Sequence, residues 1–93
     1  MAAELWAALD AYLEHLLVKQ ASPYTVRNYG REVAEAIEHF EGLGVRAFDK
    51  IDRDVVRSYM GWLHERGYER SSMARRASEL RAFGKYLVRE ELV

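Results

Sequence analysis

Two faces of predicted helices carry the side chains best suited to chemistry, and that chemistry is the binding of a polyanion. The first face is formed by side chains at positions i, i+3, i+4 and i+7, which are Tyr24, Arg27, Asn28 and Arg31. Asn and Arg can bond base edges in the major groove of DNA, and Tyr and Arg can hold phosphates. The same spacing also fits a plain ion-pair ladder on the surface, since Glu35 follows Arg31 by one turn.

The second face lies on the helix predicted over 72–89 and is more strongly basic. At about 100° per residue, small and cationic side chains project opposite Leu80. They are Ser71, Arg75, Ser78, Ala82, Lys85 and Arg89, with Arg81 at one flank. The chain has a net charge of −1, yet its last 24 residues hold six basic and three acidic side chains. That asymmetry indicates a polyanionic partner or, alternatively, only a solvated helix face.

Residues for catalysis or metal binding are scarce in this sequence. His15, His39 and His64 fall on three different predicted helices without paired spacing, so we expect no metal site. Cys is absent, which removes disulfides and thiolate chemistry. Glu35 and His39 lie four apart, but an ordinary surface contact is the simpler interpretation because nothing supplies a nucleophile. We expect no cofactor and no enzymatic activity from this chain alone.

Length and composition restrict the class of protein. The 93 residues allow one domain, spanning 1–93, and 49% apolar with 31% charged residues is typical of a globular chain. No apolar run approaches the roughly 18 residues of a membrane span. The N-terminus lacks a basic stretch followed by an apolar one, so no secretion signal is indicated. These features predict a soluble cytoplasmic protein that does not contact membranes.

The apolar periodicity is helical along nearly the whole chain and predicts an all-α fold. Ser22 and Asp52 are expected N-caps because their side-chain oxygens can accept a bond from an unpaired backbone N–H. Ser71 or Ser72 is expected to cap the last helix, and Gly67 to end the one before it. Short loops favour antiparallel neighbours, so we expect a compact four-helix bundle. The predicted helices span about 3–19, 23–40, 53–66 and 72–89.

The predicted core is formed by one apolar stripe on each helix. The stripe of the first helix is Leu5, Leu9, Leu13, Leu16 and Leu17, with Trp6 and Tyr12 at its margins. Arg76 is expected nearer the core margin, where its stem could lie along apolar surface while its charged head reaches water. Gly84 lies inside the stripe of the last helix, where backbones could approach closely.

Three runs of the sequence are similar to those of tyrosine site-specific recombinases. Ser22–Val33, followed by Phe40, resembles their opening pattern S-x-x-T-x-x-x-Y-x-x-D-L…F. Ser72–Leu87 resembles their segment S-x-x-R-x-L-S-A-L-R-x-F-x-x-Y-L. Between them, Phe48–Val56 resembles the family's lead into its third helix. The three runs occur in family order and cover nearly the whole chain.

The resemblance implies the SAM-like N-terminal core-binding domain of a phage-type integrase or Xer-like recombinase. In that family the domain clamps one half-site of double-stranded DNA through the helices that here span about 23–40 and 72–89, while other surfaces contact neighbouring protomers. A separate domain supplies the catalytic residues, and the chain ends at Val93 before such a domain could begin. We therefore expect an isolated domain that cannot cut DNA. The DNA contacts implied by position are Thr25, Arg27, Asn28, Arg31, Ser72, Arg75, Ser78 and Arg81.

The chain also departs from the family pattern. Tyr24 stands where Asn is frequent, and Glu32 where Asp is frequent. Gly30 and Gly84 replace larger residues, which suggests a locally loosened helix or close backbone packing.

Two other functions fit the residues. A protein-interaction domain without direct DNA contact would explain the near-zero net charge and the Leu-rich first helix. A helix-turn-helix regulator is the other alternative, although the loop from Gly67 to Ser72 is longer than the usual three to four residues.

Overall fold

The structure is a computed structural model that describes residues 4–19 and 22–90. The all-α prediction is confirmed, with four α-helices and one short 3₁₀ helix in the described chain. The helices match the predicted ranges closely, although Ala3, the expected first residue of the first helix, lies outside the described residues. The elements are α1 (Leu5–Val18), α2 (Pro23–Gly42), η1 (Phe48–Lys50), α3 (Arg53–Glu65) and α4 (Arg70–Arg89).

Local residue chemistry explains three helix boundaries, which are the start of α2 and both ends of α3. Ser22 Oγ accepts a hydrogen bond from the Thr25 N–H at 3.1 Å, which confirms the cap of α2. Asp52 Oδ1 accepts from the Val55 N–H at 2.9 Å and caps α3. Gly67 follows α3 with φ of 87°, the left-handed conformation that terminates a helix at low cost only for glycine.

The start of α4 differs from the prediction. The helix begins at Arg70, and its N-cap, Glu69, makes no side-chain capping bond, so the prediction that Ser71 or Ser72 caps it is wrong. The Tyr68 N–H bonds back to the Leu63 carbonyl at 3.2 Å, which reverses the chain directly after α3. Because the turn is completed at Tyr68, the serines lie within the first turn of the helix.

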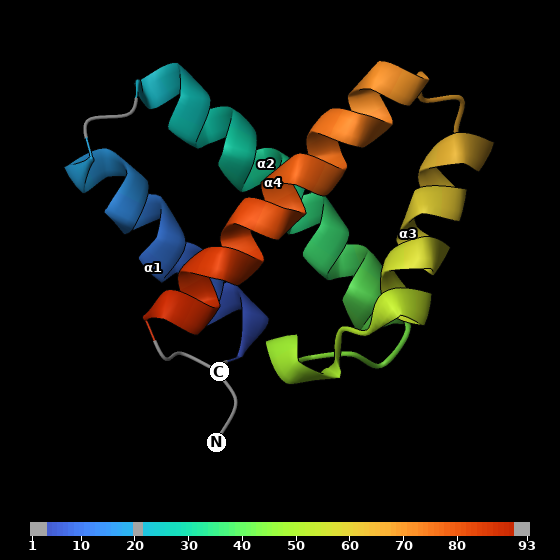
Figure 1. Ribbon diagram of the computed structural model, residues 1–93, viewed down its shortest axis with the longest axis horizontal. Coiled ribbons are helices and arrows are strands. Elements are labelled where there is room, and N and C mark those ends of the chain that lie inside the picture. The colour runs from blue at the N-terminus through green and yellow to red at the C-terminus, as the bar shows by residue number, and fades with distance from the viewer. Residues whose placement is uncertain (1–3, 20–21, 91–93) are drawn as a thin grey trace.

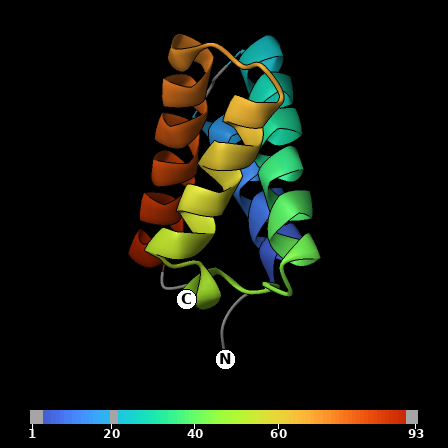
Figure 2. The ribbon, with the colours of Figure 1, turned by 90° about the vertical axis from the view of Figure 1, so that its right-hand side faces the viewer.

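The central feature of the fold is the crossing of α2 and α4 (Figure 1). α1 packs against both of them on one side and α3 packs against both on the other, as the turned view also shows (Figure 2). From the crossing, the N-terminal halves of α2 and α4 run toward the same end of the molecule (Figures 1 and 2). The packing therefore brings together segments separated by about 50 residues of sequence.

The core lies where the helices meet, and its first-helix stripe differs in detail from the prediction. Tyr12 is buried rather than marginal, whereas Leu17 is 54% exposed rather than buried. At about 100° per residue, a stripe centred between Leu5 and Leu9 includes Tyr12 but leaves Leu17 roughly 100° away. The fully buried large side chains are Tyr59, Phe40, Phe83, Leu5, Ile37, Leu63, Leu87 and Val33.

The two glycines that depart from the family pattern lie inside unbroken helices. A Cβ added to Gly84 would lie 2.9 Å from Cζ of Phe48, and one added to Gly30 would lie 3.2 Å from Cδ1 of Leu13. A neighbouring side chain, rather than another backbone, therefore occupies the space at each position. The expectation of a loosened helix or of close backbone packing is wrong for both.

Candidate nucleic-acid interface

An open pocket of about 360 Å³ lies between the N-terminal half of α2 and the facing turns of α4. We call it the α2–α4 pocket. It brings together predicted residues from both helices: Tyr24, Thr25, Asn28 and Arg31 from α2 and Arg75 from α4. The other residues that line it are Tyr29, Glu32 and Glu79. One concave surface thus combines an amide, a hydroxyl, two phenols and two guanidinium groups with two carboxyl groups. The first four kinds of group are donors that proteins use to bind phosphates and base edges.

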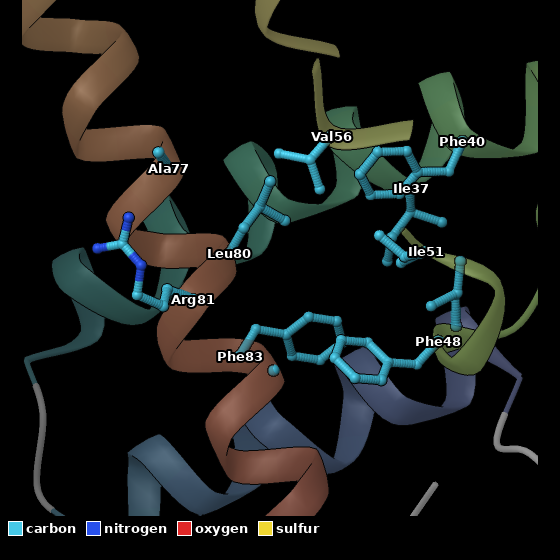
Figure 3. A pocket seen from close by; sticks show the side chains of 11 residues that line it. Ile37, Phe40, Phe48, Ile51, Val56, Ala77, Leu80, Arg81 and Phe83 are labelled. Carbon is cyan, nitrogen blue, oxygen red and sulfur yellow. The ribbon is translucent and has the colours of Figure 1, made fainter. Parts of the chain in front are cut away.

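Other predicted residues lie on the same helices but outside this pocket. Arg27 of α2 is exposed, and so are Ser71, Ser78 and Lys85 of α4, while Ser72 is half-buried. Arg81 is exposed as well but lines a different pocket, which faces α3 and η1 (Figure 3). The cations of α4 therefore point in more than one direction, and of these only Arg75 lines the α2–α4 pocket.

Arg75 is held in place by a buried carboxylate. Its Nη2 donates to Oε2 of Glu32 at 2.8 Å, and Glu32 is only 4% exposed. The Arg75 side chain nonetheless remains 59% exposed. The hydrogen bond and the charge of Glu32 raise the pKa of Arg75 above its ordinary value, so the guanidinium stays charged. One edge of Arg75 is thus fixed while the rest faces solvent.

Arg76 is the neighbouring arginine and is buried, which goes beyond the predicted place at the core margin. Its Nη1 donates to Glu35 Oε2 at 3.2 Å and to Tyr59 Oη at 3.3 Å. Its Nε lies 3.2 Å from Glu32 Oε2, an ion-pair distance without hydrogen-bond geometry. Its guanidinium also lies 4.7 Å from the centre of the Tyr68 ring. Arg76 therefore links α2, α3 and α4 and has a structural rather than a ligand-facing place.

Besides Tyr29 and Glu32, Glu79 also lines this pocket without having been predicted as a site residue. It is 5% exposed, and its Oε1 has no hydrogen-bond partner among the described residues. Burial, then the charge of Glu32 and a hydrogen bond to it, raise the pKa of Glu79 to about 7. A signal was present in the sequence, because the recombinase pattern has Ala at this position.

The pocket near Arg81 has a different chemistry. Its volume is about 350 Å³, and its walls are mainly aliphatic and aromatic side chains from the core, with Arg81 at the edge in the close view (Figure 3). Phe48 of η1 and Phe83 of α4 lie against each other there, with ring centres 6.4 Å apart. This pocket supplies no cluster of polar groups for catalysis.

The histidines do not converge. His39 Nε2 lies 3.2 Å from Ser58 Oγ, and burial lowers the pKa of His39. His15 packs against Tyr86, with ring centres 4.7 Å apart. Within residues 4–19 and 22–90, no group of three His, Asp or Glu side chains is placed to hold a metal ion. In the same residues, no helix is both long enough and apolar enough to cross a membrane.

Comparison with known proteins gives one family. Residues 9–91 match the family described as phage integrase, N-terminal SAM-like domain. The chain is 39% identical over 85 residues to tyrosine recombinase XerC of Azotobacter vinelandii, which covers 90% of this chain and 28% of that protein. It is 33% identical over 86 residues to tyrosine recombinase XerC of Anoxybacillus flavithermus, covering 91% of this chain and 29% of that relative. The chain thus spans less than a third of the length of these relatives, and no solved structure matches it significantly.

Proposed function

The chain belongs to the phage integrase N-terminal SAM-like domain family, and from this premise we propose that it is a DNA-binding module that clamps one half-site of a recombination site. The relatives are named tyrosine recombinases, and the family that this chain matches is described as an N-terminal domain. The module holds duplex DNA through α2 and α4, and a catalytic domain outside this chain cuts and exchanges the strands. On its own the chain binds DNA without cutting it.

The observation that supports this proposal is the shared pocket of the two helices. Asn28 and Arg31 on α2 face the same opening as Arg75 on α4. Arg75 is already oriented by Glu32, so little side-chain freedom is lost when a phosphate binds it. Tyr24 is largely exposed at the start of α2, where it can reach the sugar-phosphate backbone.

The remaining predicted contacts lie on the same two helices but outside the α2–α4 pocket. Arg27 on α2 and Ser78 and Lys85 on α4 are exposed, and each can bond a phosphate beyond the pocket. Ser71 and Ser72 lie in the first turn of α4. Arg81 lies on the side of α4 that faces the other pocket, toward α3 and η1. We assign these residues to backbone contacts and Asn28 to contact with a base edge.

Titration of a fluorescent duplex tests the proposal. We expect Arg75→Ala and Arg27→Ala to weaken binding by about three- to thirtyfold each at low salt and to lower the salt dependence by about one unit. Arg57→Ala is the matched control, because Arg57 is an exposed arginine on α3, which contributes no residue to the pocket. Unchanged binding by both test variants, with circular dichroism showing intact folds, would refute the proposed interface.

Protein contact is a second candidate function, favoured by the exposed end of α1. Leu17 is 54% exposed and Val18 is 80% exposed. A neighbouring protomer could cover these side chains, with or without DNA. Amide NMR shifts on adding duplex distinguish the two functions. Shifts confined to α1, with Asn28 and Arg75 unaffected, would favour protein contact over DNA binding.

A further inference from the structure

Two buried carboxyl groups line the same pocket as the exposed guanidinium of Arg75. Glu32 of α2 and Glu79 of α4 are 4% and 5% exposed, and both line the α2–α4 pocket. Glu32 Oε2 binds Arg75 at 2.8 Å and lies 3.2 Å from Nε of Arg76. Glu79 Oε1, in contrast, has no hydrogen-bond partner in the described chain. Glu32 is therefore paired with two arginines, whereas one oxygen of Glu79 lacks a hydrogen-bond donor among the described residues.

This arrangement favours a shared proton. Two ionised carboxylates at such close range repel each other, and burial further penalises the second charge. The other groups that face Glu79 are Tyr12 of α1, whose own pKa is raised, and Arg75 and Arg76 of α4. Because burial and Glu32 outweigh the two arginines, the pKa of Glu79 lies at about 7. The charges of Glu32, Glu79, Arg75 and Arg76 thus sum to about +1 below neutral pH and to about zero above it.

We propose that Glu32 and Glu79 are positioning residues for DNA contact: Glu32 fixes Arg75 at the pocket wall, and the proton on Glu79 leaves that guanidinium available to a phosphate. This inference rests on the DNA-binding function proposed above and adds a dependence on pH. When Glu79 loses its proton, a second carboxylate competes for Arg75 and repels the phosphate. Affinity for duplex DNA therefore falls as the pH rises through neutrality.

The size of the effect follows from proton linkage. A phosphate close to Glu79 disfavours its ionised form, so DNA binding raises the pKa of Glu79 further. Each unit of difference between the free and bound pKa corresponds to about a tenfold difference in affinity between the two protonation states. A difference of about one unit gives a decrease in affinity of about fivefold between pH 6 and pH 8.

The test compares the 93-residue chain with Glu79→Gln and Glu38→Gln, using a fluorescent duplex of mixed sequence at constant low ionic strength. Gln at position 79 imitates the protonated acid, so we expect its affinity to vary little over this pH range and to exceed that of the original chain at pH 8. Glu38 is an exposed acid farther along α2, and Glu38→Gln makes the same change in net charge at pH 8, where Glu79 is ionised. It should keep the pH dependence of the original chain. Apart from positions 38 and 79 the three proteins have the same side chains, so other effects of pH cancel in the comparison.

A second measurement does not involve DNA. Carboxyl-carbon NMR of the free chain should show Glu79 titrating near pH 7. Since its folded pKa lies above the ordinary value of 4.5, the folded state binds the proton more tightly than the unfolded state. The original chain should therefore lose stability as the pH rises from about 4.5 to 7, relative to Glu79→Gln.

A double-mutant cycle tests the role of Glu32. Glu32→Gln should weaken duplex binding in the original chain but have a much smaller effect in an Arg75→Ala background, because the residue acts through Arg75. Equal effects in both backgrounds would show a merely structural role. If Glu32→Gln does not fold, the pH profile of Glu79→Gln still decides the proposal.

The outcomes separate this inference from the proposed function. Duplex binding with the same pH dependence in the original chain and in Glu79→Gln overturns the positioning role and leaves DNA binding intact. A Glu79 titration near the ordinary value for glutamate overturns it as well. Absence of duplex binding at every pH overturns both proposals.

Discussion

At the scale of single residues, Arg76 shows how a buried charge can organise a small domain. Its guanidinium contacts carboxylates of α2 and phenol groups on α3 and on the turn before α4. These partners come from separate parts of the sequence, so helical periodicity places Arg76 near the core but cannot identify what it binds. The ion pair with Glu32 is buried on both sides, so removing only one of its partners is costly.

We predict that Arg76→Met destabilises the fold by about 3 kcal/mol. Met fills a similar volume, but it leaves the buried carboxylate of Glu32 with one cation fewer and Tyr59 without its hydrogen bond. Urea unfolding followed by circular dichroism measures the loss. Arg57→Met, at an exposed position of α3, should change stability by no more than about 0.5 kcal/mol. Similar losses in the two variants would contradict the importance of this cluster.

At the scale of helices, the capping side chains explain two boundaries that the sequence predicts correctly and one that it does not. Ser22 and Asp52 each bond the backbone N–H three residues ahead, a local interaction that depends only on neighbouring residues. Ser71 and Ser72 have the same chemical ability, but the turn through Gly67 and Tyr68 places them inside the helix. A capping residue is thus identified reliably only when the preceding turn is also known.

The caps give a matched prediction. Ser22→Ala should lower the free energy of unfolding by about 1 kcal/mol, because the Thr25 N–H loses its acceptor at the start of α2. Ser71→Ala should change it by less than about 0.5 kcal/mol, since that hydroxyl caps no helix. Chemical denaturation of both variants provides the measurement. A larger loss from Ser71→Ala would mean that α4 begins later than described.

At the scale of the whole molecule, η1 closes the bundle between α3 and α4. Phe48 packs on the Gly84 face of α4 and against the ring of Phe83. Gly84 is thus required by a contact with a segment 36 residues earlier, which no local pattern indicates. The adjoining apolar pocket is consequently part of the packing of the bundle (Figure 3).

Two glycine variants test this closure. Gly61→Ala on α3 should stabilise the chain by about 0.5–1 kcal/mol, because a Cβ meets nothing within 4 Å there and alanine favours the helix. Gly84→Ala should instead destabilise it by about 1 kcal/mol, because the Cβ would meet Phe48 at 2.9 Å and displace its ring. Thermal unfolding of the two variants measures both changes in stability. A gain in stability from both would show that Phe48 moves away at negligible cost.

The four helices and the polar faces of α2 and α4 could be predicted without a structure, because helical periodicity and side-chain type are local properties of the chain. The same local information indicated the family, which the comparisons confirmed. Three features could not be predicted in this way: Arg75 binds Glu32, Glu79 is buried in the same pocket, and Arg81 faces another pocket. These contacts depend on the angle at which α2 and α4 cross, and that angle is set by the packing of all the helices together.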